Sequence, residues 1–106
     1  MLPAYSKPIP APSPAFPGLQ PPVPTAVVLA VKNEAQTIGQ QVRKLLAEGT
    51  VAIVVDNAST DGTSQAAAGA GAWVVQAGKE LSFRAAILQG VRMAASMGSQ
   101  VLITRA

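Results

Sequence analysis

The residues of this chain that could carry out acid–base or metal chemistry are few, and all of them are carboxylates. The sequence of 106 residues contains no histidine and no cysteine. A disulfide framework, a zinc site of the usual ligands and catalysis by histidine or cysteine are therefore excluded. Acidic chemistry must come from five side chains, which are Glu34, Glu48, Asp56, Asp61 and Glu80.

Among the five carboxylates, Asp56 has the position that most strongly indicates a ligand-binding role. It directly follows a short apolar run, residues 51–55, with the β-branched composition of a buried strand. An acidic group at the end of such a strand can accept hydrogen bonds from a nucleobase or a ribose. The alternative is that Asp56 and its neighbour Asn57 shape a turn through local backbone hydrogen bonds.

The elements that position these residues alternate between apolar runs and helical patterns. Strands are predicted at residues 27–31, 51–55, 72–75 and 101–103, and the first two have the composition of buried strands. Gly49 stands where the first helix would be capped at its C-terminus. The apolar residues that predict this helix lie on one face and are Ile38, Val42, Leu45 and Leu46.

Two further helices are predicted. Ser59, Thr60 and Asp61 offer capping oxygens and a first-turn carboxylate to a short alanine-rich helix that ends near Gly69 or Gly71. Ser82 can cap the third helix. Its apolar positions keep a helical period and are Phe83, Ala86, Ile87, Gly90, Val91 and Ala94.

This order predicts an α/β protein with a Rossmann-like, three-layer α/β/α arrangement. We expect a parallel sheet of four strands in the order 3-2-1-4, joined by right-handed crossovers. Ligands bind such sheets outside the carboxyl ends of the strands, where the strand order switches. The site is therefore expected among residues 32–34, residues 56–61 and those after 103.

Three segments carry a resemblance to a known family. Residues 31–35 (Val-Lys-Asn-Glu-Ala) and 54–63 (Val-Val-Asp-Asn-Ala-Ser-Thr-Asp-Gly-Thr) resemble the N-terminal half of family 2 glycosyltransferases of the inverting, GT-A type. Residues 85–90 (Ala-Ala-Ile-Leu-Gln-Gly) are similar to that family's helix before strand 4. The resemblance implies an incomplete GT-A fold that binds a nucleotide-diphospho-sugar. It also implies that full-length relatives are enzymes of the hexosyltransferase type, which transfer a sugar to an acceptor hydroxyl with inversion.

The resemblance also implies roles for individual residues. It assigns nucleotide contact to Asp56 and Asn57. Glu34 could help to hold the nucleotide or support the loop that follows the second strand. The alternative is that Glu34 is a first-turn carboxylate that is stable there without a function. Arg84 stands where the family often carries a basic residue facing the diphosphate, and a solvated surface arginine is the alternative.

The chain departs from the family at the metal-binding position. An Asp-x-Asp motif after strand 4 binds the divalent metal, Mg or Mn, that neutralises the sugar diphosphate, and here Arg105 stands at its first Asp. Ala30 and Lys32 also replace a commoner proline and aromatic. We expect no metal, cofactor or catalytic base in this chain. Residues 25–106 are interpreted as a truncated nucleotide-sugar-binding half, inactive alone, whose C-terminal half is missing or on a partner chain.

The prolines, the net charge and the length of the apolar runs limit which partners and which location we expect. All nine prolines lie in residues 1–24, which predicts a disordered proline-rich arm. A non-catalytic interaction module that docks through this arm, or a non-functional gene fragment, is the alternative function. The net charge of +3 comes from scattered cations, so no nucleic-acid partner is expected. No apolar run approaches the ~20 residues that span a bilayer, so we expect no transmembrane segment and a cytoplasmic location.

Overall fold

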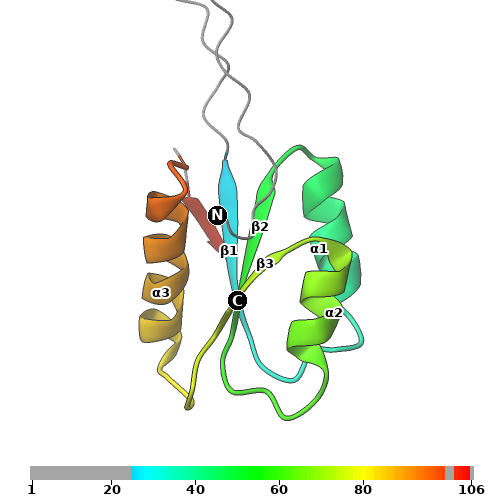
Figure 1. The fold of residues 1–106 in the computed structure, drawn as a ribbon, viewed down its shortest axis with the longest axis vertical. Coiled ribbons are helices and arrows are strands. Elements are labelled where there is room, and N and C mark those ends of the chain that lie inside the picture. Colours follow the sequence, from blue (N-terminus) through cyan, green and yellow to red (C-terminus); the bar gives the residue numbers. More distant parts are fainter. Residues whose placement is uncertain (1–24, 100–101, 106) are drawn as a thin grey trace, which may run out of the picture.

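The computed structural model describes residues 25–99 and 102–105. The predicted proline-rich arm, residues 1–24, lies outside the described residues. The elements follow in the order β1 (Ala26–Val31), α1 (Ile38–Ala47), β2 (Val51–Asp56), α2 (Thr63–Ala70), β3 (Trp73–Gln76), α3 (Phe83–Ser96) and β4 (Leu102–Arg105) (Figure 1). The predicted α/β alternation of strands and helices is confirmed.

The strands form a parallel sheet in the order β3-β2-β1-β4. Val31 at the end of β1 pairs with Asp56 at the end of β2, and Asp56 pairs with Gln76 at the end of β3. These three strands therefore end together, at what we call the carboxyl edge of the sheet. The loops that follow them start side by side there.

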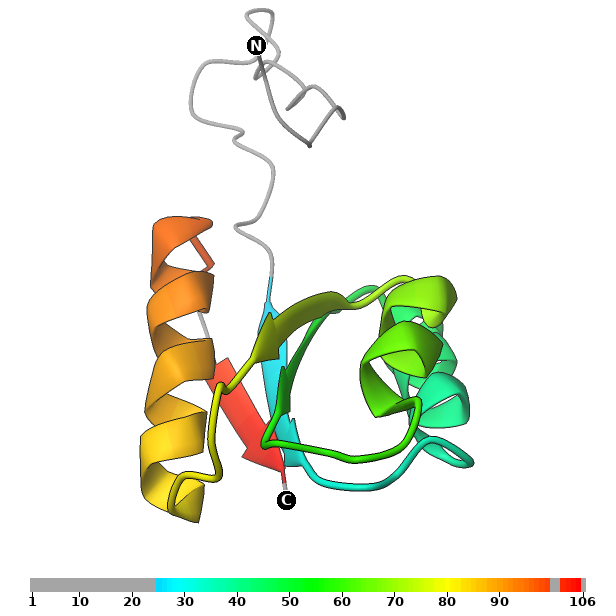
Figure 2. The same ribbon diagram turned by 60° about the horizontal axis from the view of Figure 1, so that its bottom comes forward.

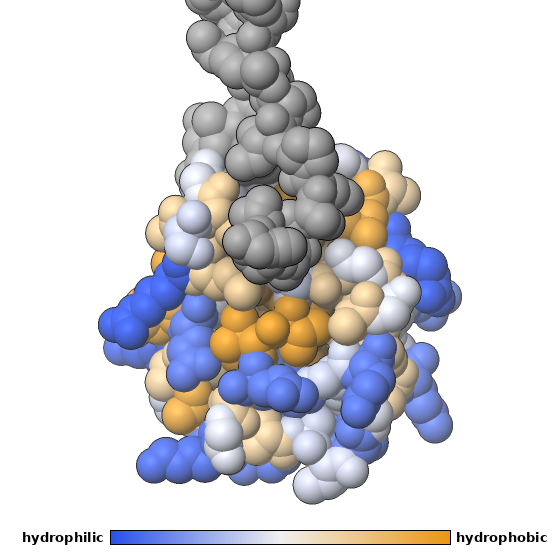
Figure 3. All heavy atoms as spheres, in the orientation of Figure 1, coloured by the Kyte–Doolittle hydropathy of each residue, from blue (hydrophilic) through white to orange (hydrophobic). Residues whose placement is uncertain are grey.

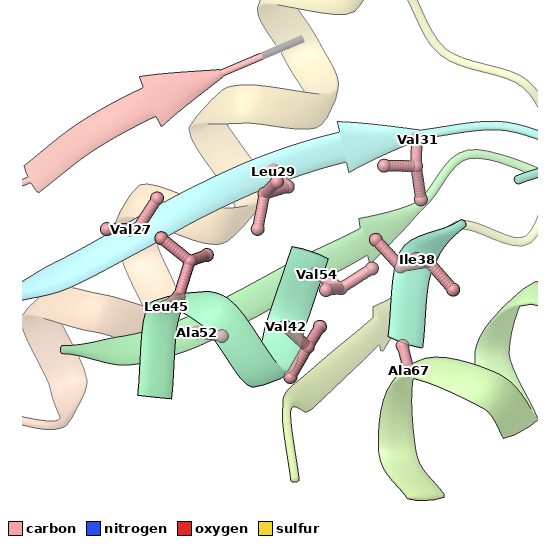
Figure 4. Close-up of a cluster of buried hydrophobic side chains, with 9 residues drawn as sticks. All are labelled: Val27, Leu29, Val31, Ile38, Val42, Leu45, Ala52, Val54 and Ala67. Carbon is pink, nitrogen blue, oxygen red and sulfur yellow. The ribbon is translucent and has the colours of Figure 1, made fainter. Parts of the chain in front are cut away.

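The helices cover both faces of the sheet, with α1 and α2 on one face and α3 on the other (Figures 1 and 2). Strand β1 contributes to both faces because successive side chains of a strand point in opposite directions. Val27, Leu29 and Val31 belong to the cluster beneath α1 and α2, whereas Ala26 and Val28 belong to the cluster beneath α3. Figure 4 shows the first cluster, in which side chains of α1 and α2 meet those of β1 and β2.

The predicted apolar face of α1 is confirmed in part. Ile38, Val42 and Leu45 are buried, whereas Leu46 is 39% exposed. Leu46 lies at the margin of the stripe, because each residue advances the helix by about 100°. Gly49 has a φ of +83°, a conformation that glycine adopts without a steric penalty, and it ends the helix as predicted.

Helix α3 lies close to the sheet because its buried residues are small. These residues are Ala86, Gly90 and Ala94. A Cβ atom at Gly90 would lie 2.3 Å from Cγ1 of Val28 and 3.0 Å from Cγ2 of Val55. Such contacts are shorter than side chains tolerate, so glycine sets the distance between α3 and the sheet.

The start of α3 agrees with the predicted cap but not with the whole predicted apolar face. The Ser82 hydroxyl accepts a hydrogen bond from the amide of Ala85 at 3.1 Å, which confirms Ser82 as the N-cap. Phe83 was expected on the buried face, but its side chain is 52% exposed. The buried stripe begins later, at Ala86, so Phe83 remains at the end of the helix near the carboxyl edge.

The surface is mixed in character. In the view of Figure 3, hydrophobic side chains gather near the middle of the face and hydrophilic ones border it.

Strand β3 lies at the edge of the sheet, with Trp73 and Gln76 exposed and Val74 and Val75 half-buried. In the described part of the chain, no helix combines the length and the hydropathy needed to cross a bilayer.

Candidate functional site

Three loops leave the carboxyl edge of the sheet and are joined to one another. We call them the first loop (residues 32–37), the second loop (57–62) and the third loop (77–82), which follow β1, β2 and β3. Side chain–backbone hydrogen bonds join the first loop to the second, and others join the second to the third. An ion pair joins the first to the third. The loops therefore form one connected polar surface.

Asp56 lies at the base of this surface and is only 6% exposed. Its Oδ1 accepts a hydrogen bond from the amide of Ser59 at 2.9 Å, and its Oδ2 accepts one from the Ser64 hydroxyl. Its backbone carbonyl accepts bonds from the amides of Ala58 and Ala77, each at 3.0 Å. The alternative role considered for Asp56, shaping a turn through local backbone hydrogen bonds, is therefore present in the structure.

A hollow of about 460 Å³ opens beside Asp56. Its lining comes from the end of β2, the second loop, the end of β3 and the third loop, and consists of Asp56, Ala58, Ser59, Gln76, Ala77 and Gly78. A second hollow, of about 320 Å³, lies between α2 and β3, and Gln76 lines both. The predicted ligand-contact residue Asp56 is thus part of a concave surface at the carboxyl edge.

Asn57 connects the second loop to the third. Its side-chain amide donates to the carbonyl of Leu81 at 2.9 Å, and its Oδ1 accepts from the amide of Leu81 at 2.7 Å. Its own backbone amide donates to the carbonyl of Val31 at 2.8 Å. The side chain predicted to contact a ligand is therefore engaged in positioning the third loop, which forms one wall of the hollow.

The backbone of Glu34 reaches the first residue of α2. Its amide donates to the Thr63 hydroxyl at 2.9 Å, and its carbonyl accepts bonds from the amides of Thr37 and Ile38. The carboxylate instead accepts a long hydrogen bond, 3.4 Å, from the side chain of Gln41. The structure thus places the Glu34 backbone against the start of α2 and its side chain beside α1.

The predicted capping of α2 by Ser59 and Thr60 is wrong. The N-cap of this helix is Gly62, which has no side chain that could accept a capping hydrogen bond. The Ser59 hydroxyl accepts from the amide of Asn33, and the amide of Thr60 donates to Oδ1 of Asn33, both at 2.8 Å. These residues precede the helix by almost a turn, so they bond across to the first loop instead.

Asp61 is the one of the three proposed capping residues that contacts the start of α2. Its Oδ1 accepts from the amide of Thr63 at 3.0 Å and from the Thr63 hydroxyl, and its Oδ2 accepts from the amide of Ala35 at 3.2 Å. The Thr63 hydroxyl, with the amides of Ala35 and Thr63, holds the pKa of the Asp61 carboxyl below its ordinary value of 3.8. Asp61 therefore ties the first loop to the start of α2 in its ionised form.

Sequence reasoning missed the positioning role of Asn33. It has a φ of +55°, in the left-handed region that Asn tolerates better than most residues. This conformation directs its amide and its side-chain oxygen to Ser59 and Thr60. The available signal was an Asn two positions after the end of the strand predicted at residues 27–31. Ala58 has a φ of +62° without such a favourable side chain.

Arg84 is the predicted site residue that the structure does not join to the others. It is exposed in the first turn of α3, just after the third loop. Among residues 25–99 and 102–105, no hydrogen bond or ion pair involves its side chain. Nearby, Nζ of Lys32 lies 2.7 Å from Oε1 of Glu80 and links the first loop to the third.

The residues present do not fit a divalent metal. In the part of the chain that the structure describes, no group of three or more His, Cys, Asp or Glu side chains could hold a metal ion. Asp56 and Asp61 are each engaged with neighbouring hydroxyls and amides. We therefore derive no chemical step through a metal.

A family model described as "Glycosyl transferase family 2" matches residues 26–102. The matched region contains the three loops and every residue that lines the two hollows. No curated protein matches the chain.

Proposed function

The chain belongs to glycosyl transferase family 2, and from this premise we propose that its carboxyl edge binds the nucleotide part of a nucleotide-diphospho-sugar. The observation that carries the proposal is the hollow of about 460 Å³ with Asp56 in its lining. A pocket at the carboxyl ends of parallel strands is the usual ligand site of an α/β sheet.

Asp56 has the hydrogen-bonding capacity that this role needs. Each of its carboxylate oxygens accepts one hydrogen bond among the described contacts. An ionised carboxylate has about four lone-pair sites in total. The remaining sites can accept bonds from the N–H of a base or from a ribose hydroxyl, while Ser59 and Ser64 keep the carboxylate in place.

Three other residues support binding in different ways. Arg84, exposed and without a bonded partner among the described residues, supplies a guanidinium for the diphosphate. Asn57 holds the third loop as a wall of the hollow. Glu34 supports the start of α2 through its backbone bond to Thr63.

The wider proposal concerns the reaction of the family. We propose that the sheet is the nucleotide-binding part of a GT-A domain, and that sugar transfer to an acceptor hydroxyl with inversion belongs to full-length relatives. The metal expected in those relatives is assigned to no residue of this chain. What we propose for this chain is binding.

Calorimetric titration with uridine and guanosine diphospho-sugars tests the proposal. Asp56→Asn keeps the shape of the side chain and removes its charge, and we expect it to weaken binding by about 10-fold or more. Gly78→Phe should block the hollow without touching the core, because among the described residues no atom beyond its chain neighbours lies within 4 Å of a Cβ at Gly78. Gly69→Phe is its matched control, since Gly69 has equally open surroundings but lines neither hollow.

The outcomes separate the proposal from its alternatives. Tight binding that is lost in Gly78→Phe and kept in Gly69→Phe supports it, provided that both variants unfold at the temperature of the parent. Binding of equal strength in all variants would contradict a site at the hollow. No heat with any nucleotide sugar would contradict the proposal and favour a non-catalytic interaction module.

A further inference from the structure

An exposed ion pair joins the first loop to the third. Nζ of Lys32 lies 2.7 Å from Oε1 of Glu80, and the two side chains are 40% and 61% exposed. Exposed ion pairs of this kind contribute little to stability, because water and salt screen the attraction. The pair is therefore easily exchanged for another partner.

The third loop does not need this ion pair to keep its place. At one end, the amide of Ala77 donates to the carbonyl of Asp56 at 3.0 Å. At the other end, the backbone of Leu81 makes two hydrogen bonds with the Asn57 side chain. Only the exposed middle of the loop, residues 78–80, lies between these attachments.

Lys32 does not line the hollow, but it is joined to the third loop, which forms one of the walls. It directly follows Val31, whose carbonyl accepts the amide of Asn57, so Lys32 and Asn57 are neighbours at the ends of adjacent strands. The ion pair then joins Lys32 to Glu80, which precedes the Asn57 partner Leu81. The Lys32 ammonium group consequently lies beside the loop whose residues Ala77 and Gly78 line the hollow.

The charges around the third loop favour an anion. Lys32, Lys79 and Arg84 are exposed there, and Glu80 is the only carboxylate in the sequence after Asp61. Lys32, Lys79, Glu80 and Arg84 thus contribute three positive charges and one negative charge. A cluster with excess positive charge attracts phosphate groups and forms charge-assisted hydrogen bonds with them.

We propose that Lys32 binds the diphosphate of the ligand, and that Glu80 holds the Lys32 ammonium group until the diphosphate replaces it. This inference rests on the proposed nucleotide site and adds a residue to it. Glu80 acts as an internal competitor, so it lowers affinity for nucleoside diphosphates. It leaves the affinity for nucleosides unchanged, because they have no phosphate to meet Lys32.

Titration of charge-neutralising variants with UDP, GDP and the two nucleosides tests this inference. We expect Glu80→Gln to bind the diphosphate about 3-fold more tightly, and Lys32→Gln to bind it about 10-fold more weakly. In the double variant, Glu80→Gln should have no effect, because the lysine it released is gone. Lys44→Gln and Glu48→Gln remove the same charges from the end of α1 at the opposite edge of the sheet, and should change nothing.

Three results would overturn the inference, and they differ in what they say of the proposed function. If Glu80→Gln tightens binding equally with and without Lys32, its charge acts at long range and Lys32 is not the residue released. If UDP or GDP binds all variants equally, the nucleotide site stands but Lys32 does not contact the diphosphate. If neither nucleosides nor diphosphates bind the parent or any variant, both proposals fail together.

Discussion

The side chains of β1 pack into apolar clusters on the two faces of the sheet. Residues of the first loop, which follows β1, are instead held by hydrogen bonds at the carboxyl edge of the sheet. In the interior, Val28 and Leu29 are at most 1% exposed and touch other hydrocarbon. At the edge, Asn33 and Glu34 bond to Ser59, Thr60 and Thr63.

The interior and the carboxyl edge should respond differently to amino-acid substitutions. Packing in the interior depends on volume, so an added methyl group must displace a neighbour. Order at the edge depends on donors and acceptors, each of which contributes about 1 kcal/mol net but costs more when its partner is removed. The interior should therefore govern stability, and the edge should govern the shape of the hollow.

The largest effect on stability is expected at Gly90, in the interior. Gly90→Ala places a methyl group 2.3 Å from Val28, and we expect it to lower the free energy of unfolding by about 1–3 kcal/mol relative to its control. The control is Gly69→Ala, where no atom of the described residues beyond its neighbours in the chain and its own helix backbone lies within 4 Å of the added Cβ. Both glycines lie in helices, so both variants gain helix propensity. Equal urea midpoints for the two variants would show that α3 shifts easily and that packing at Gly90 does not limit stability.

A smaller loss is expected at Thr63, where the edge meets α2. Thr63 is fully buried, and its hydroxyl accepts from Glu34 and donates to Asp61. Thr63→Val keeps the volume and leaves the Glu34 amide without this partner, which we expect to cost about 1–2 kcal/mol. Thr50→Val should cost less, because the carbonyl of Leu45 keeps a bond from the Thr50 amide. Urea unfolding of both variants measures the difference, and equal losses would argue against a special role of Thr63.

A gain is expected at Ala58, which adopts a φ of +62°. Ala58→Gly removes the clash of Cβ in the left-handed region and should stabilise the protein by about 0.5–1 kcal/mol. The same substitution at Ala95, exposed in α3, should destabilise by a similar amount, because glycine is unfavourable within a helix. A loss of stability at both positions would mean that Ala58 is not strained.

The smallest effect should appear on acidification, through Asp61. Its pKa is lowered in the folded chain by the Thr63 hydroxyl and by amides, so its contribution to stability is complete above the ordinary value of 3.8. This contribution is lost as the pH falls through the lower folded pKa. Below pH 3.8, the urea midpoint of the parent should therefore fall towards that of Asp61→Asn. Parallel profiles for the two proteins across this range would contradict the assignment.

The elements of the fold could largely be predicted, because their signals are local. Apolar runs marked β1 and β2, spaced apolar residues marked the buried face of α1, and Ser82 marked the start of α3. The errors fell at the margins of these patterns, at Leu46 and Phe83, which are 39% and 52% exposed. Periodicity gives the direction of a side chain, but it does not tell where the sheet ceases to cover the helix.

The candidate site could be predicted only in part. Residue type and position after a strand were enough to select Asp56, which lines the hollow. They did not reveal that the Asn57 side chain binds the backbone of Leu81, or that Ser59 and Thr60 bond to the first loop. Each of these partners is 24 or more positions away in the sequence, so no local pattern reveals it.

The sequence by itself determined which segments become strands and helices, the parallel character of the sheet and the family resemblance. These follow from short-range propensity, period and motif. Tertiary structure alone decided how the three loops bond, that Glu80 meets Lys32, and that glycine sets the distance between α3 and β1. The physical reason is that hydrogen bonds and close packing depend on distances of a few tenths of an ångström between residues far apart in the chain, and only the folded arrangement defines such distances.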